Sequence, residues 1–287
     1  MIAHSVRGII DFLQAQICYQ LFITPILFPL EREYREFARR ACDFLQKERT
    51  ETLHFDMPRH HVVHHFAQQR SKGAKRILIA HGWMSRAAYM ARLIRALHKE
   101  GFDVFALDFP AHGEAKGMQL PWIDAVDVLH QVFNHLGPFY AVIGHSFGGS
   151  MLLNTLNLAS QYTRWNIQRE PEHVVLLASP TRMNTPVIRL ARQFRLTAKG
   201  YLLLRQVFRQ KAVVDLKRLD FRYYIPHAQI PFLCVHGEND TVIKPCESIV
   251  FCEHYQHASL SLLPNMDHVS ILLDNRVEEV VCDFLLK

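Results

Sequence analysis

The chain has 287 residues, with 33 Lys+Arg against 27 Asp+Glu, a formal net charge of +6, 49% hydrophobic residues and 21% charged residues. This is the composition of a soluble globular protein, and it excludes a disordered chain, a collagen-like repeat and a small disulfide-stapled domain. The length fits one or two domains, and large α/β folds often use it as one. A charge of +6 on so long a chain does not indicate nucleic-acid binding, so we expect no nucleic-acid partner.

Residues 1–50 are predicted to form a helical extension. The apolar run at 17–30 contains Gln20 and two prolines and precedes no small-residue cleavage site, so it is predicted to be neither a membrane span nor a signal peptide. Apolar residues recur at helical spacing before and after the prolines, at Val6, Ile9, Ile10, Leu13 and Ile17 and at Tyr34, Phe37, Ala41, Phe44 and Leu45. We expect two helices packed on the main domain. Weak membrane-surface contact or dimerisation is the alternative, and the oligomeric state stays open.

The chain has eighteen histidines, more than usual, and six scattered cysteines, but they form no metal-ligand motif. The six cysteines include no CxxC pair and are interpreted as reduced core residues of a cytoplasmic protein. The histidine doublets at 60–61 and 64–65 lie in a predicted strand, with no Cys or carboxylate partner at ligand spacing. We therefore predict no metal and no other cofactor.

From about residue 51 onward, short apolar runs alternate with helical patterns. The runs that predict strands lie at residues 60–68, 75–80, 103–108, 139–145, 173–179, 230–236 and 258–263, and the last three are predicted to be buried. This alternation predicts an α/β fold with a mainly parallel, doubly wound sheet and helices on both faces. Reactive groups of such sheets lie at the carboxyl ends of the strands.

The strongest motif is Gly144-His145-Ser146-Phe147-Gly148, between a predicted strand and a predicted helix. This G-x-S-x-G pattern is typical of a nucleophile elbow, in which a sharp, strained turn exposes the serine hydroxyl. Side chains at the flanking glycines would meet the neighbouring strand and helix. Ser146 is therefore the candidate nucleophile.

A serine nucleophile needs a base, and the base needs an orienting acid. His268 follows the predicted strand at 258–263, and Asp240 follows the one at 230–236. Both positions lie at the same edge of the sheet as Ser146, so His268 is the candidate base and Asp240 the candidate acid. Glu238 and Asp267 are alternative acids, ranked below Asp240 because of its place after the strand end.

Acyl transfer also needs two backbone N–H donors for the oxyanion. Phe147 follows the nucleophile at a helix start, and Trp83 follows the strand at 75–80 in the sequence His81-Gly82-Trp83. We expect Trp83 and Phe147 to form the oxyanion hole, and His81, Gly82 and His145 to line the substrate site.

From about residue 77 to the C terminus, the chain resembles α/β-hydrolase fold enzymes. The resemblance rests on HGW at 81–83, DFPAHG at 108–113, GHSFGG at 144–149, GEND at 237–240 and DH at 267–268. The HGW sequence resembles carboxylesterases that include pimeloyl-carrier methyl esterases. Ala111 departs from the pattern, because a glycine is common there. The resemblance implies a hydrolase domain at 51–287 with a helical cap at about 181–228.

The predicted cap is strongly basic. Residues 182–222 contain 11 Lys+Arg and 2 Asp, which leaves the rest of the chain slightly acidic. Such a cap could steer an anionic partner to the site, or it could be a solvated helix face. We predict a serine hydrolase that cleaves a small-molecule carboxylic ester or thioester, of carboxylesterase type. A membrane-surface lipid or lysophospholipid hydrolase and a non-catalytic ligand-binding protein are the alternatives.

Overall fold

A computed structural model describes residues 2–26, 32–68, 73–212, 219–221 and 229–287. These residues form one eight-stranded sheet of order β1-β2-β4-β3-β5-β6-β7-β8. Strand β2 runs antiparallel to its neighbours β1 and β4, and the strands from β3 to β8 run parallel. The strands are β1 (Glu51–Phe55), β2 (His61–Phe66), β3 (Arg76–Ala80), β4 (Asp103–Asp108), β5 (Ala141–His145), β6 (His173–Leu177), β7 (Phe232–Gly237) and β8 (Ala258–Leu263). The predicted mainly parallel sheet is confirmed.

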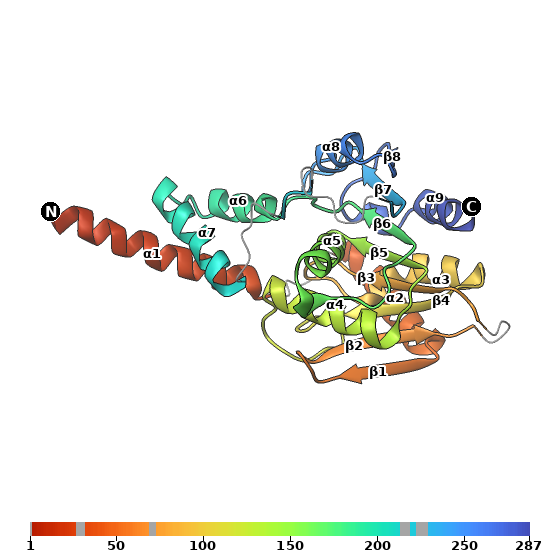
Figure 1. Cartoon of the computed structure of the whole chain (residues 1–287). Coiled ribbons are helices and arrows are strands. Elements are labelled where there is room, and N and C mark those ends of the chain that lie inside the picture. Colours follow the sequence, from red (N-terminus) through yellow and green to blue (C-terminus); the bar gives the residue numbers. More distant parts are fainter. Residues whose placement is uncertain (1, 27–31, 69–72, 213–218, 222–228) are drawn as a thin grey trace.

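Helices cover both faces of this sheet, as predicted (Figure 1). Side chains alternate along β3, where Leu78 packs into one core cluster while Ile77 and Ile79 pack into the other. The first cluster also contains residues of α4 (Trp122–Leu136), α5 (Phe147–Gln161) and α8 (Cys246–His254). The second contains residues of α3 (Ala91–Lys99), the preceding 3₁₀ turn η1 (Ala87–Met90) and α9 (Asn275–Leu286).

The two N-terminal helices are α1 (Ile2–Ile23) and α2 (Arg32–Glu48), and they pack into different core clusters. Ala15 and Cys18 of α1 are buried in the first cluster, whereas Ala41 and Leu45 of α2 are buried in the second. Helix α2 packs on the main body, as expected. Helix α1 instead packs chiefly along α7 (Ala198–Ala212), and only its C-terminal end reaches the main body, where Ile23 O accepts the Leu120 N–H at 2.7 Å. The two helices are separate, as the prolines between them lead one to expect, and Pro29 lies outside the described residues. None of the described helices is long and apolar enough to cross a membrane.

Helices α6 (Asn184–Gln193) and α7 (Ala198–Ala212) lie between β6 and β7 in the sequence. Together with α1 they extend to one side of the sheet (Figure 1). Apolar side chains recur at helical spacing in both helices, and most of them are buried, at Val187, Ala191, Leu204, Val207 and Phe208. Leu190 is half-buried, and Phe194 is 39% exposed because α6 has already ended there. Parts of the predicted cap, at 213–218 and 222–228, lie outside the described residues.

Two details differ from the sequence-based expectations. Strand β8 is only partly buried, because it forms the edge of the sheet and has a neighbour on one side only. Cys246 is exposed at the start of α8, although Cys18 and Cys234 are buried and all six cysteines are unpaired thiols. The interpretation of every cysteine as a core residue was therefore wrong for Cys246.

Candidate active site

Ser146 occupies the turn between β5 and α5 and has a positive φ of 51° with ψ of −116°. This left-handed conformation is costly for a residue with a Cβ atom. The flanking glycines allow it, since a Cβ on Gly144 would lie 2.3 Å from Gly149 Cα and one on Gly148 would lie 2.2 Å from Ala80 O. The Ser146 N–H donates to Leu177 O at 2.9 Å, which ties the turn to β6.

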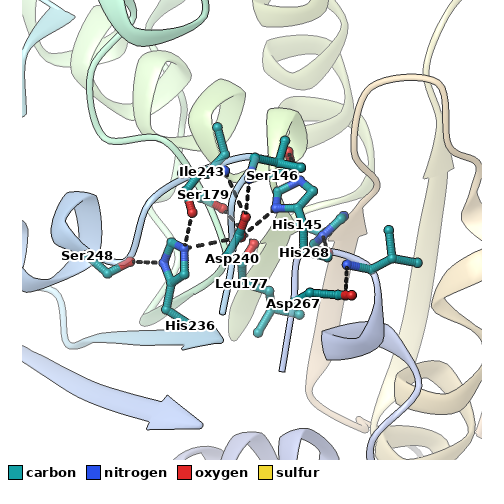
Figure 2. Close-up of polar contacts among 12 residues, drawn as sticks. His145, Ser146, Leu177, Ser179, His236, Asp240, Ile243, Ser248, Asp267 and His268 are labelled. Carbon is teal, nitrogen blue, oxygen red and sulfur yellow. Dashed lines mark hydrogen bonds and ion pairs between the residues drawn. The ribbon is translucent and has the colours of Figure 1, made fainter. Parts of the chain in front are cut away.

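His268 bridges Ser146 and Asp240 (Figure 2). The Ser146 hydroxyl lies 2.9 Å from His268 Nε2, and His268 Nδ1 lies 2.7 Å from Asp240 Oδ2. The Asp240 carboxylate accepts a hydrogen bond from the Nδ1–H group of His268, so Nε2 carries the lone pair that faces the hydroxyl. The three residues follow the carboxyl ends of β5, β7 and β8, which lie on the same side of the sheet. This geometry is that of a serine nucleophile with a base and an orienting acid.

The Asp240 carboxylate is buried, but both of its oxygens accept hydrogen bonds. Its Oδ1 accepts the N–H groups of Val242 and Ile243, each at 2.8 Å, and its Oδ2 lies 3.4 Å from His236 Nε2. Burial acts to raise the pKa of Asp240, but the hydrogen bonds from His236 and His268 outweigh it and hold this pKa well below its usual range. Asp240 therefore stays a carboxylate and can stabilise a positive charge on His268.

The two alternative acids lie elsewhere. Asp267 Oδ1 accepts the N–H groups of Val269 at 2.9 Å and Ser270 at 2.8 Å, so its side chain closes the turn after β8 (Figure 2). Glu238 is exposed. Of the three candidates, the structure brings Asp240 against the His268 ring.

Trp83 and Phe147 come together beside Ser146. Their rings form an edge-to-face pair with centroids 5.2 Å apart. Neither backbone N–H has an acceptor among the described residues. The Phe147 N–H also lies at the start of α5, where the aligned peptide dipoles favour negative charge. The Phe147 N–H and the helix N-terminus thus adjoin Ser146, and the Trp83 N–H belongs to the loop that approaches Ser146 at Gly82.

The expectation that His81 and His145 line the substrate site needs correction, because their side chains are 0% and 5% exposed. His81 Nε2 accepts the Phe109 N–H at 3.2 Å, so its side chain holds the segment after β4 against the segment after β3. His145 Nε2 donates to His268 O at 3.1 Å, and burial followed by the charge of His268 lowers the pKa of His145 to about 3. Gly82 does lie at the site, since a Cβ there would be 3.3 Å from Ser146 Cβ.

A buried polar network holds the loop that carries Trp83. Asp108, 1% exposed, accepts the Ala87 N–H at 2.7 Å and lies 3.0 Å from His64 Nε2. His112 Nε2 accepts the Met84 N–H at 3.2 Å, while its Nδ1 donates to Pro110 O at 2.9 Å. The loops after β3 and β4 are therefore fixed to each other.

Three residues of the site were missed in the sequence. His236 Nε2 donates to Ile243 O at 2.9 Å and lies 3.4 Å from the candidate acid. His112 holds the loop of Trp83, and Phe22 of α1 stacks on the Trp83 ring. The spacing of four residues between His236 and Asp240, across a strand end, was the one local signal available.

Within the described part of the chain, no three His, Cys, Asp or Glu side chains gather as metal ligands. His64 of the second doublet is held by Asp108 instead.

Comparisons with known proteins address the family and the fold of the chain. The sequence profile described as "Alpha/beta hydrolase family" matches residues 77–283. The chain is 24% identical over 246 residues to a pimeloyl-[acyl-carrier protein] methyl ester esterase of Nitrosospira multiformis, covering 68% of this chain and 88% of the relative. The fold is similar to that of the Pyrococcus furiosus esterase Pf2001, with a TM-score of 0.59, 20% identity and coverage of 92% and 96%. It is also similar to Est1E from Butyrivibrio proteoclasticus, with a TM-score of 0.60, 16% identity and coverage of 83% and 98%.

Proposed function

Because this chain belongs to the alpha/beta hydrolase family, we propose that it is a serine hydrolase that cleaves a carboxylic ester or thioester through an acyl-enzyme intermediate. The observation that carries the proposal is the unbroken series of contacts from Ser146 Oγ through His268 to Asp240, at 2.9 Å and 2.7 Å. The nucleophile lies at a strained turn and the acid is fully ionised, which is the arrangement that acyl transfer requires.

In the proposed acylation step, Ser146 Oγ attacks the carbonyl carbon while His268 Nε2 removes its proton. The positive charge on the imidazolium is stabilised by the Asp240 carboxylate. The carbonyl oxygen becomes an oxyanion that accepts hydrogen bonds from the N–H groups of Trp83 and Phe147. When the tetrahedral intermediate collapses, His268 returns the proton to the leaving alcohol or thiol, and the acyl group remains on Ser146.

In the proposed deacylation step, the same residues act on water. His268 Nε2 removes a proton from a water molecule, whose oxygen attacks the acyl carbon. Collapse of the second intermediate breaks the bond to Ser146 Oγ, which takes the proton back from His268 and releases the carboxylic acid. His145 stays neutral beside this cycle because its pKa is lowered to about 3 by burial and by the charge of His268.

The aromatic rings around Trp83 support an acyl group as the part of the substrate bound there. The Trp83 ring packs against Phe147, His112 at 5.0 Å and Phe22 at 6.4 Å, measured between centroids. We expect a preference for short to medium acyl chains. The exposed arginines and lysines of the α6–α7 segment, which we propose to act as a cap, fit a substrate with an anionic group, such as a carrier-linked or coenzyme A-linked acyl chain.

Labelling with a fluorophosphonate tests the nucleophile. We expect the wild-type chain to be labelled and Ser146→Ala to remain unlabelled. Ser160→Ala, at the other end of the same helix α5, is the matched control and should be labelled like the wild type. Absence of labelling in all three proteins would contradict the proposal and favour a ligand-binding protein with an idle triad.

A panel of p-nitrophenyl esters of increasing chain length, followed by acyl-coenzyme A thioesters, tests the substrate class. We expect kcat/KM to be highest for short to medium acyl chains. Activity only on chains longer than about twelve carbons would contradict the expected packing of the acyl group among the rings near Trp83.

A further inference from the structure

Helix α1 presents an uncovered row of large apolar side chains. Ile9, Leu13 and Ile17 follow each other at intervals of four residues and are 57%, 52% and 57% exposed, with Ile10 and Phe12 beside them at 48% and 49%. The opposite face of the helix is buried, so the exposed row lies on the outer side of α1. We call these five side chains the α1 apolar row.

Charged groups are kept out of this row. Asp11 is the only charged residue from residue 8 to 23, and its carboxylate is buried, where it accepts a hydrogen bond from Thr197 Oγ1 at 2.7 Å. The exposed polar neighbour within the row is the uncharged Gln20. A solvated helix surface would carry charged residues at such positions.

Positive charge adjoins the α1 apolar row at its N-terminal end, where Arg7 is exposed one turn before Ile10, and in the basic α6–α7 segment that packs against α1. Residues 183–212 contain seven Lys or Arg residues and no Asp or Glu. Six of these side chains are exposed, at Arg189, Arg192, Arg195, Lys199, Arg209 and Lys211. Helices α1 and α7 are in direct contact. Tyr19 of α1 packs on Phe208 of α7 with ring centroids 5.1 Å apart, and a Cβ on Gly8 of α1 would lie 3.2 Å from Lys199 Nζ of α7.

The size of the row distinguishes its possible partners. Five side chains of roughly 200 Å² each, about half exposed, offer on the order of 500 Å². Each partner in a typical stable protein complex buries about 800 Å². A bilayer surface needs no such matching area, and a helix lying in it combines an apolar face with flanking basic residues that attract anionic headgroups.

We infer that the α1 apolar row, flanked by the basic α6–α7 segment, is a docking surface for an anionic lipid bilayer. Helix α1 lies along the interface, since it is not apolar enough to cross it. The inference concerns binding alone and does not depend on the proposed hydrolase activity. Phe22, near the end of the same helix, contacts Trp83, so docking would place the candidate active site next to the bilayer.

Vesicle flotation of the full-length chain tests the inference. We expect binding to vesicles of equimolar phosphatidylcholine and phosphatidylglycerol, and much weaker binding to phosphatidylcholine alone. Leu13→Gln/Ile17→Gln should reduce the partition coefficient roughly tenfold or more, because two apolar contacts with the acyl region are lost. The matched control Met57→Gln/Leu286→Gln changes side chains that are 70% and 56% exposed elsewhere and should bind like the wild type.

Hydrolysis of a water-soluble ester should be unchanged in Leu13→Gln/Ile17→Gln, and vesicle binding should be unchanged in Ser146→Ala, so the two proposals fail separately. Absence of binding to the anionic vesicles, or equal binding by Leu13→Gln/Ile17→Gln, would overturn the inference. Equal binding to neutral vesicles would overturn the inference that the bound bilayer is anionic. A dimer in sedimentation velocity that Leu13→Gln/Ile17→Gln abolishes, without vesicle binding, would assign the row to a second copy of the chain.

Discussion

Phe22 of α1 stacks on Trp83 in the loop after β3, with ring centroids 6.4 Å apart and an angle of 19° between the ring planes. Phe22 also contacts Phe208 of α7 edge to face, at 5.0 Å. The N-terminal helix thus supports a residue whose N–H is proposed to stabilise the oxyanion, and it joins that residue to the α6–α7 segment.

This contact predicts a chain-length effect for Phe22→Ala. We expect kcat/KM for a p-nitrophenyl hexanoate substrate to fall about tenfold, and for the acetate ester to fall less, because the lost ring packs on the wall proposed to hold the acyl chain. Phe12→Ala removes an exposed ring of the same helix and serves as control. An equal loss for both esters would contradict a role of Phe22 in acyl binding.

The choice of acid predicts a large difference between two Asp→Asn substitutions. Asp240→Asn keeps an acceptor for the Val242 and Ile243 N–H groups but removes the charge beside His268, so kcat should fall by about 10⁴ while the fold persists. Asp267→Asn affects only the turn after β8 and should change kcat by a few-fold at most. Steady-state kinetics with a thermal melt of both proteins decide the point. Comparable losses in the two variants would argue against the assignment of Asp240.

The fold and the central residues of the site could be predicted because their signals are local. The glycines around Ser146 are dictated by the turn itself, and Asp240 and His268 each follow a strand. Phe22 and His112 could not be found in this way, because their contacts with Trp83 and Met84 depend on how distant segments pack. Burial of His81 and His145 was hidden for the same reason. At Ala111, where a glycine is common, the residue adopts a positive φ of 63°, which explains the preference for glycine there.

Gly82→Ala should disturb the loop that carries Trp83 without unfolding the protein. The added Cβ would lie 2.8 Å from His145 Nδ1 and 3.3 Å from Ser146 Cβ, so the loop must shift away from the nucleophile. A displacement of this kind can lower kcat up to about a hundredfold. Gly8→Ala is a control, because its Cβ would meet only the flexible end of Lys199, at 3.2 Å. Wild-type kcat in Gly82→Ala would count against Trp83 as an oxyanion donor.

Buried histidines predict that the protein loses stability in mild acid. Burial, followed by the charge of His81, lowers the pKa of His112 to about 4, and its Nε2 is occupied by the Met84 N–H. Between pH 6.5 and 4 the unfolded chain binds a proton at this residue that the folded chain does not, so the free energy of unfolding falls as the pH falls. The slope per histidine is about 1.4 kcal/mol per pH unit.

Urea unfolding of His112→Asn at several pH values between 7 and 4 tests this account. The substitution should cost stability at pH 7, where the Met84 contact is weakened, and should make the loss of stability toward pH 4 shallower by up to about 1.4 kcal/mol per pH unit. His54→Asn, which alters an exposed histidine, should keep the steep wild-type slope. If His112→Asn loses stability with pH as steeply as the wild type, His112 binds its proton equally in the folded and unfolded chain, and the acid sensitivity arises at other residues.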